Sequence, residues 1–481
     1  MGSEKRSFIS EDWLSLWIGL FVFILSLGLF FDLDMLGWGL KTNVWTDINK
    51  SISTLSANYE GLPGIFSLLL TYFFLLLIVG IGLIALGVKF KDFLVPFTII
   101  FFISYICWLL GHFAYVAATS DKLGQFNISW SLNLTGEAGY IVALLAGLII
   151  GNFFPGLVNK LKPATRPELF IKTAIVIMGG ALGVKAAESL GLASSVMFRG
   201  LCAIVEAYLI YWALVYFVAR KYFKFSKEWA APLASGISIC GVSAAIATGG
   251  AIRARPIIPI MVSSLVVVFA VLELILLPFL AQIFLWKEPM VAGAWMGLAV
   301  KTDGAAVASG AITDALIRAK VLAETGIHYK EGWIVMTTTT VKVFIDVFIG
   351  IWAFILAIIW CSKFDKSKSG ERVKAREIWD RFPKFVIGYG LTFIVFLGIC
   401  LLIPEVTGNA KAAANEANGL RQMFFVLTFF TIGVVSNFKK LKEEGIGKLA
   451  LVYLLCLFGF IIWIGLLISW IFFQGITPPV I

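Results

Sequence analysis

Long apolar runs separated by short polar segments fill this chain from end to end. A helix needs about 20 apolar residues to cross roughly 30 Å of hydrocarbon. Runs of that order lie near residues 14–31, 63–87, 93–118, 134–151, 168–187, 198–219, 256–285, 331–361, 384–403, 421–437 and 446–473. The pattern predicts an all-α polytopic membrane protein.

Two segments between these runs have a different composition. Residues 234–250 and 297–310 are rich in Gly, Ala, Ser and Thr, and the second carries Lys301 and Asp303. Glycine-broken polar helix is tolerated in a bilayer only where it is buried in protein or lines a watery cavity. Two broken helices in one chain point to the binding site of a transporter. With them, we expect about thirteen membrane elements by the same length rule.

Composition and charge support a membrane protein over other classes. Of the 481 residues, 60% are hydrophobic and only 14% are charged, which excludes an ordinary soluble domain. The net charge of +10 comes from basic residues in alternate loops, which is the positive-inside pattern rather than a nucleic-acid-binding surface. It predicts a cytoplasmic N-terminus and an external C-terminus. These residues are Lys89, Lys91, Lys160, Lys162, Arg166, Arg220, Lys221, Lys224, Lys227, Lys439, Lys440, Lys442 and Lys448, with the densest run at 363–384.

The change of composition along the chain predicts four regions. Residues 1–130 form a three-helix extension or scaffold, 131–361 a first repeat region with both broken segments, 362–383 a charged cytoplasmic loop, and 384–481 the helices that complete a second repeat. Two segments share one pattern, in which apolar residues are followed by Gly-Val and then by a charged stretch that ends in Gly. They are Ile175–Gly191 and Phe429–Gly445. The charge pattern gives the two segments opposite orientations, so they indicate an inverted repeat, with chance similarity of glycine-rich helices as the alternative.

The charge pattern leaves the course of the broken segments open. They can both cross the bilayer, or both re-enter as hairpins from opposite faces. Only the turn at 253–255 and the stretch around Lys287 change side between these alternatives.

Ionisable residues at membrane depth are costly, so each is a functional hypothesis. Lys301 and Asp303 lie inside the second broken segment, and Lys342 and Asp346 lie four residues apart on one helical face. The functional interpretation is that a lysine neutralises an anionic substrate while Asp303 or Asp346 exchanges a proton or binds a cation. The alternative is a structural ion-pair network. For Glu206 and Glu273, the apolar residues around them show no glycine breaks, which favours a role in helix packing or at a helix interface.

Short polar residues supply the other half of the predicted site. Hydroxyls and free N–H groups at a half-helix N-terminus make an anion cradle, because the positive end of the helix dipole lies there. Small-residue helix packing is the alternative. The predicted substrate-binding residues are Ser238, Cys240, Gly241, Ser243, Lys301, Thr302, Thr340 and Lys342, and the predicted coupling residues are Asp303 and Asp346.

Enzyme motifs are not found in the sequence. Two histidines, no phosphate-binding or dinucleotide-binding glycine motif and no zinc-ligand spacing argue against catalysis, so we expect no catalytic residue, cofactor or metal. The six cysteines are scattered through apolar segments, without paired spacing.

The first broken segment also carries a family resemblance. Ser238–Gly241 (SICG), followed by Ser243–Ala245 (SAA), resembles the core motif of the YeiH-like (UPF0324) family of sulfate exporters, over roughly residues 135–475. The family is related to the bile-acid-symporter and sodium–proton-antiporter fold group. This resemblance implies inverted repeats, an elevator-type core that moves against a scaffold, a homodimer and a bacterial inner membrane. The family usually shows Val-His-Glu-Val-Ala-Gln where this chain has Val300–Ala305 (VKTDGA), and Asp346 lies near a position where relatives often carry Arg.

The sequence therefore predicts a secondary active transporter of a small anion, with sulfate or a related sulfur oxyanion as the implied substrate. Protons or a monovalent cation are the expected coupling partners, and we expect the protein to lie in a lipid bilayer. The alternatives are an anion channel or a non-transporting membrane scaffold with a structural polar core.

Overall fold

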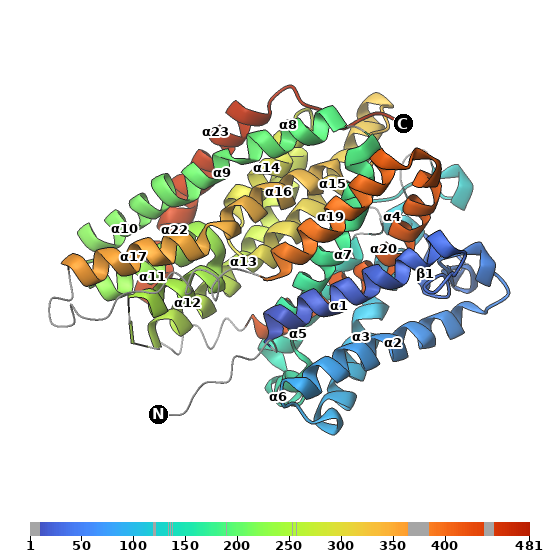
Figure 1. The fold of residues 1–481 in the computed structure, drawn as a ribbon, viewed down its shortest axis with the longest axis horizontal. Coiled ribbons are helices and arrows are strands. Elements are labelled where there is room, and N and C mark those ends of the chain that lie inside the picture. Colours follow the sequence, from blue (N-terminus) through green and yellow to red (C-terminus); the bar gives the residue numbers. More distant parts are fainter. Residues whose placement is uncertain are drawn as a thin grey trace. The chain divides into compact units, whose positions relative to one another are not determined.

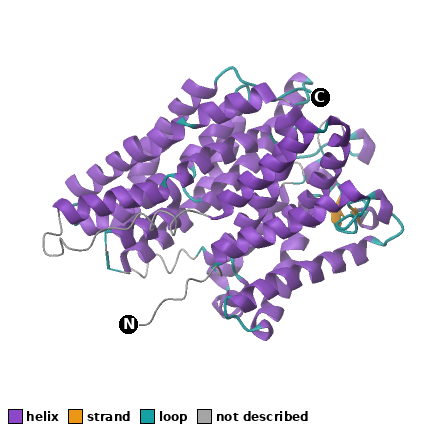
Figure 2. Ribbon diagram, viewed as in Figure 1, coloured by secondary structure: helices purple, strands orange, loops and turns teal. Residues whose placement is uncertain are grey.

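Helices account for most of the described protein, with one small pair of strands (Figure 2). The computed structural model describes residues 10–118, 122–132, 134, 136, 138–188, 190–252, 254–255, 257–363, 384–436 and 447–481. The predicted loop 362–383 and the end of the segment Phe429–Gly445 lie mostly outside this range, as do the side chains of Ser243 and Asp303. All eleven predicted apolar runs coincide with helices.

The all-α membrane fold is confirmed. Within the described residues, nine helices are long and apolar enough to cross a membrane, and the pair α5–α6, bent by 114°, makes a tenth. The remaining predicted elements are α13, a continuous helix of 28 residues, and the two broken segments.

The chain forms two units. Unit 1 comprises residues 1–192 and 384–435. Its α-helices are α1 (Glu11–Ser26), α2 (Gly64–Ala85), α3 (Phe90–Gly111), α4 (Ala114–Ala117), α5 (Ala138–Phe153), α6 (Pro155–Leu161), α7 (Pro167–Glu188), α19 (Lys384–Leu402) and α20 (Thr407–Val435). Short 3-10 helices are η1 (Leu27–Phe31), η2 (Ile48–Lys50), η3 (Ala57–Tyr59), η5 (Gly124–Phe126), η6 (Lys162–Ala164) and η10 (Pro404–Val406), and the strands are β1 (Leu40–Thr42) and β2 (Ile52–Thr54).

Close packing of α7 and α20 organises unit 1. Helix α7 packs against α1, α19 and α20, and α20 also packs along α5 (Figure 1). Gly147 of α5 lies directly against the backbone of α20 at Phe430, and Gly433 of α20 lies against the backbone of α5 at Leu144. A side chain at either glycine would force the helices apart, which is the small-residue packing expected in lipid.

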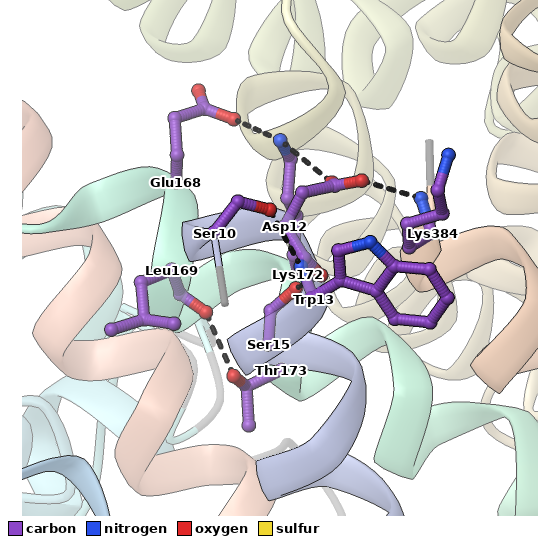
Figure 3. A network of polar contacts seen from close by, with 9 residues as sticks. All are labelled: Ser10, Asp12, Trp13, Ser15, Glu168, Leu169, Lys172, Thr173 and Lys384. Carbon is purple, nitrogen blue, oxygen red and sulfur yellow. Dashed lines mark hydrogen bonds and ion pairs between the residues drawn. The ribbon is translucent and has the colours of Figure 1, made fainter. Parts of the chain in front are cut away.

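Three helices of unit 1 begin at one polar junction (Figure 3). Asp12 in the first turn of α1 accepts a hydrogen bond from the backbone N–H of Lys384 at 2.6 Å, and Lys172 of α7 lies 3.4 Å from Asp12 and 3.6 Å from Glu168. Ser10 caps α1 by accepting from the N–H of Trp13. The helices α1, α7 and α19 therefore start at the same end of the unit, as the charge pattern requires for helices that leave one face.

Unit 2 comprises residues 193–383 and 436–481, with α8 (Leu190–Gly200) at its boundary. Its other α-helices are α9 (Cys202–Val205), α10 (Trp212–Lys221), α11 (Lys227–Ser235), α12 (Gly241–Ala251), α13 (Ile257–Phe284), α14 (Pro289–Ala299), α15 (Asp303–Thr325), α16 (Trp333–Val347), α17 (Ile349–Lys363), α22 (Gly447–Cys456) and α23 (Ile462–Phe473). The π-helical segments η7 (Glu206–Tyr211), η8 (Gly236–Cys240) and η11 (Leu457–Ile461) interrupt three of its membrane elements.

The first broken segment is a hairpin. Helices α11 and α12 lie side by side (Figure 1), and the Thr248 hydroxyl donates to Ser235 Oγ at 2.7 Å between them. At the open end, the backbone N–H of Arg255 donates to Glu228 Oε1 at 2.8 Å. The two ends of this first hairpin (α11–η8–α12) therefore lie together, and its tip is at Gly241.

The second broken segment is also a hairpin. Helices α14 and α15 both pack against α16, but in opposite directions along it. Gly293 of α14 lies beside Ile334, near the start of α16, where Asp314 of α15 accepts backbone hydrogen bonds from Gly332 and Ile334 at 3.0 and 3.1 Å. This second hairpin (α14–α15) turns at residues 300–302, where Thr302 caps α15 by accepting from the N–H of Ala305.

The long helix α13 connects the two hairpins and touches both tips. Its Pro259 lies beside Gly249 near the open end of the first hairpin, and its Val266 lies beside Gly241 at the tip. About two turns beyond, Glu273 binds the tip of the second hairpin. Because α13 then runs on toward the start of α14, the hairpins enter unit 2 from opposite ends of α13. Of the two courses left open by the sequence, this geometry corresponds to re-entry from opposite faces.

Candidate functional site

The tips of the two hairpins touch in the interior of unit 2. A Cβ atom on Gly241 would lie 3.0 Å from Thr302 Cγ2 and 3.2 Å from the Lys301 carbonyl oxygen. Only glycine fits this close approach of two backbones. The structure therefore brings together two predicted sets of residues that are separated by about sixty positions in the sequence.

Two helix N-termini meet at this junction of the tips. Helix α12 starts at Gly241, and α15 starts at Asp303, immediately after the cap Thr302. The first turn of a helix has backbone N–H groups without intrahelical partners and carries the positive end of the helix dipole. Both half-helices thus present partial positive charge to one buried place, which suits an anion.

The two predicted lysines hold the opposite, carbonyl ends of the half-helices. Lys342 of α16 donates from Nζ to the Ile239 carbonyl at 2.8 Å, in η8 just before the first break. Lys301 donates from Nζ to the Leu298 carbonyl, in the last turn of α14. Each ammonium group lies at the negative end of a half-helix dipole, which stabilises the break, and only 1–2% of each residue is exposed.

The serines of the first hairpin differ in their surroundings. Ser235 Oγ accepts hydrogen bonds from Trp212 Nε1 at 2.9 Å and from the Thr248 hydroxyl. Ser238 is completely buried in η8, yet within the described residues its hydroxyl has no hydrogen-bond partner. A buried polar group without a partner is costly, so Ser238 is a candidate to bind a ligand at the break.

Most hydroxyls of the Thr337–Thr340 run are used within the fold. Thr337, Thr338 and Thr339 donate to carbonyl oxygens four residues earlier in α16, and Thr338 also lies 2.7 Å from the Gly293 carbonyl. These three hydroxyls are therefore satisfied by carbonyl oxygens of the fold. Thr340 is buried on α16, one and a half turns from Asp346, which is also buried.

Glu273 is a structural part of the junction. Its Oε2 accepts the backbone N–H of Lys301 at 2.9 Å, and its Oε1 accepts the hydroxyl of Tyr453 at 2.6 Å. The sequence favoured a role in helix packing or at a helix interface for this residue. Its carboxyl group joins the tip of the second hairpin to α13 and α22.

Glu206 lies in η7, on the inward side of the long helix that contains α8, α9 and α10. No part of the residue is exposed, and both carboxyl oxygens lack a hydrogen-bond partner among the described residues. The neighbouring Tyr211 donates its hydroxyl proton to the Ile461 carbonyl at 2.7 Å, and its ring centroid lies 4.3 Å from Lys301 Nζ. The π-helical segments η7 and η11 are thus joined beside the second hairpin. Such segments are frequent at functional sites.

An apolar groove adjoins Glu273. It has a volume of about 490 Å³ and is bounded by α13, α14, η11 and α23. Several of its lining side chains, including Phe284 and Trp463, are exposed and would face lipid. The lining residues are Glu273, Leu276, Leu277, Leu280, Phe284, Leu285, Trp295, Leu457, Phe458, Ile462, Trp463 and Leu466.

Sequence reasoning did not identify the aromatic residues around the junction. Tyr211, Tyr453 and Trp295 reach the carbonyl of Ile461, the carboxyl of Glu273 and the carbonyl of Ile462 respectively. These contacts join residues far apart in the chain, so no local sequence pattern predicts them. The sequence does identify Glu206 and Glu273, because carboxylates are rare at membrane depth.

The comparisons with known proteins agree with the predicted family. The profile of the family described as "Conserved hypothetical protein 698" matches residues 105–452. A UPF0324 membrane protein of Nitrosomonas europaea is 41% identical over 98% of this chain and 97% of its own length. A UPF0324 membrane protein of Rhodopirellula baltica is 29% identical over 86% of this chain and 68% of its own length. No solved structure matches the chain. The protein belongs to the UPF0324 family of membrane proteins.

Proposed function

We propose that this protein is a secondary active transporter of a small anion, with its substrate site where the hairpin tips meet. The observation that carries the proposal is the meeting of two re-entrant hairpins at Gly241 and Thr302, with two helix N-termini and two buried lysines. Broken helices whose half-helix ends face a common interior point are typical of transporter sites.

The electrostatics favour an anion over a cation or a neutral solute. The N-terminal N–H groups of α12 and α15 carry partial positive charge, and Lys301 and Lys342 add full charges nearby. The Ser238 hydroxyl is an available donor at the first break. An anion at the tips would attract the lysines away from the Ile239 and Leu298 carbonyls, which couples binding to rearrangement of both hairpins.

Burial of the site favours a carrier over a channel. Ser238, Cys240, Lys301 and Lys342 are each no more than 2% exposed. A substrate therefore reaches them only after a conformational change, as alternating access requires. Elevator motion, a homodimer and location in a bacterial inner membrane with a cytoplasmic N-terminus remain predictions from the family resemblance and the charge pattern.

The substrate class rests on the resemblance alone. The relatives are named as membrane proteins, without a transported molecule. Sulfate and related sulfur oxyanions are the first anions to test. Coupling to protons or to a monovalent cation through Asp303 or Asp346 stays a prediction.

One observation favours the alternative of a structural polar core. Each lysine already has a carbonyl partner at a half-helix end, so both could serve only to stabilise the breaks. Replacement of a lysine distinguishes the alternatives, because a structural role affects folding without an effect on ligand binding.

The test combines a thermal-shift screen of anions with flux into proteoliposomes. At 100 times its Kd, a bound anion stabilises the native state by about 2.7 kcal/mol. We expect saturable, counter-substrate-stimulated uptake of labelled sulfate or sulfite, and loss of both uptake and anion-dependent stabilisation in Lys342→Met. The matched control is Lys320→Met, whose ammonium lies 5.7 Å from the Trp286 ring, away from the tips. Unsaturated conductance, or anion stabilisation unchanged in Lys342→Met, contradicts the proposal.

A further inference from the structure

Glu206 is a buried acid within reach of the Tyr211 hydroxyl, which donates its proton to the Ile461 carbonyl instead. Glu206 is completely buried in η7, and both carboxyl oxygens lack a partner among the described residues. Its chain neighbours Val205 and Leu209 point outward and are 53% and 64% exposed. An ionised carboxylate in such a place is strongly destabilised, because burial removes its hydration without replacing it.

The geometry around Glu206 favours its protonated form. A Cβ atom at Gly465 would lie 2.7 Å from Tyr211 Oη and 3.5 Å from Glu206 Oε1, so both oxygens face the same point on α23. The Tyr211 hydroxyl has one proton, and it donates that proton to Ile461. It can therefore only accept a further hydrogen bond, and only the acid form of Glu206 has a proton to donate.

The titratable groups that act on Glu206 are few. They are Cys202 on its own helix, Tyr211 one π-turn later, and Lys301 on the second hairpin. Lys301 is also acted on by Glu273 and Lys342, and Glu273 by Tyr453. Lys301 thus connects Glu206 to the tips of the hairpins. A change of charge at Glu206 therefore changes the electrostatic potential at the proposed anion site.

Glu273 provides the contrast within the same cluster. Its carboxylate accepts hydrogen bonds from Tyr453 and from the Lys301 backbone, which stabilise the ionised form. Of these two carboxyl groups, Glu206 gives up fewer hydrogen bonds when it takes up a proton.

We propose that Glu206, in place of Asp303 or Asp346, is the proton-binding group of the transport cycle, and that one proton crosses the membrane together with the anion. This inference rests on the proposed function. When the site opens to water, the Glu206 carboxylate takes a proton from the aqueous phase and an O–H bond forms. The cluster gains one positive charge, which favours anion binding near Lys301. When the site opens to the other face, the anion leaves, the same O–H bond dissociates and the proton passes to the water on that face.

A sodium ion suits this place less well than a proton does. Hard cations require several oxygen ligands. The ammonium group of Lys301 acts on Glu206 and would repel a second cation, whereas protonation removes charge from the carboxyl group without a coordination shell. Sodium dependence is accordingly an outcome that would overturn the proposal.

The first experiment detects the proton directly, without transport. Infrared difference spectra of the full-length protein in nanodiscs, taken between acid and neutral pH, should show the C=O stretch of a buried carboxylic acid. We expect this band to be lost in Glu206→Gln and retained in Glu416→Gln. Glu416, on α20 of unit 1, is a matched control because it is also a buried glutamate with one oxygen, Oε2, lacking a described partner.

The second experiment separates exchange from coupled transport. In proteoliposomes with the membrane potential held at zero, wild-type protein should accumulate a monovalent anion such as bisulfite about tenfold per unit of pH gradient at one proton per anion. Glu206→Gln should retain exchange of labelled sulfite for unlabelled sulfite and lose accumulation driven by the gradient. Glu206→Asp, which keeps an acid, should retain both.

The outcomes separate this inference from the proposed function. If the wild-type protein transports no anion, the proposed function fails, and the infrared band still decides whether Glu206 takes up a proton. The inference is overturned if the band persists in Glu206→Gln, if that variant still accumulates anion with the pH gradient, if it loses exchange as well while remaining folded, or if sodium replaces protons as the driving ion.

Discussion

At the scale of single residues, Ser235 and Ser238 are a natural pair of opposite controls. Both are fully buried in the first hairpin, but Ser235 accepts hydrogen bonds from Trp212 and Thr248, whereas Ser238 has no partner in the described protein. The same substitution, Ser to Ala, should therefore have different consequences at the two positions.

We expect Ser235→Ala to lower stability and Ser238→Ala to lower anion affinity. Loss of the Ser235 hydroxyl leaves the Trp212 indole N–H unpaired, at a cost of about 1–3 kcal/mol, with little effect on anion affinity. Loss of the Ser238 hydroxyl leaves stability nearly unchanged and removes a hydrogen bond to the anion worth about 1.5 kcal/mol, hence roughly tenfold in Kd. Thermal unfolding with and without sulfate measures both effects. Equal behaviour of the two variants would contradict the assignment of Ser238.

The sequence predicted some residues of the site for physical reasons that are local. Lys301 and Lys342 stand out because charges are rare in apolar segments, and the motif Ser238–Gly241 stands out by its small polar residues. The sequence did not predict that each lysine donates a hydrogen bond to a half-helix carbonyl, or that the Glu273 carboxylate accepts one from the backbone N–H of Lys301. Those bonds depend on which helices pack together, and this information is absent from any single segment.

At the scale of elements, the re-entrant course of the first hairpin depends on contacts at its open end. Glu228 at the start of α11 accepts from the backbone N–H of Arg255 at 2.8 Å and from its Nε at 3.2 Å. The hydrogen bond from the Arg255 backbone is the main cause that lowers the pKa of the Glu228 carboxyl, with its guanidinium contributing further, against the opposing effect of burial.

We expect Glu228→Gln to loosen this hairpin at neutral pH and to have no effect in acid. Because the native pKa is lowered, the native state binds fewer protons than the unfolded chain. The stabilisation is complete above the ordinary glutamate pKa of about 4.3 and is lost as the pH falls through the native value. The pair is partly exposed, so the effect should stay below about 1 kcal/mol.

Hydrogen exchange of the backbone amides of 227–251 measures this effect. Protection should fall in Glu228→Gln at pH 7, and the difference from wild type should vanish at low pH. Glu405→Gln, at an exposed position of η10 in unit 1, serves as the control and should leave 227–251 unchanged. A difference that persists in acid would show that the charge of Glu228 is not the cause.

The sequence could predict where the helices break but not how the chain continues after each break. Glycine and short polar side chains at 234–250 and 297–310 reveal the interruptions, since such composition is out of place in lipid. Re-entry is instead set by tertiary contacts such as Thr248 with Ser235 and Asp314 with Gly332, which fold each half-helix back on its partner. The distribution of basic residues places most loops on the same side of the membrane whether the broken segments cross it or re-enter.

At the scale of the whole molecule, re-entry fixes which loops share a face of the membrane. The first hairpin starts after the basic residues Arg220 and Lys224 and ends at Arg255, so all three belong to one face. The helix α13 then leads to Lys287 and the start of α14. Glu288 accepts from the backbone N–H of Gly475 at 2.8 Å, so the C-terminal end of α23 lies on the face of Lys287.

Cysteine labelling in intact cells tests this arrangement. With a membrane-impermeant maleimide applied from outside, Lys287→Cys and Gln474→Cys should react, whereas Lys224→Cys and Arg255→Cys should react only after the cells are opened. The unsubstituted protein is labelled in parallel as the blank. Five of its six cysteines, Cys107, Cys202, Cys240, Cys400 and Cys456, are buried. If Arg255→Cys reacted from the face opposite to Lys224→Cys, the first broken element would cross the membrane. The two hairpins could then no longer approach each other from opposite faces, and the carrier site proposed at their tips would lose its basis.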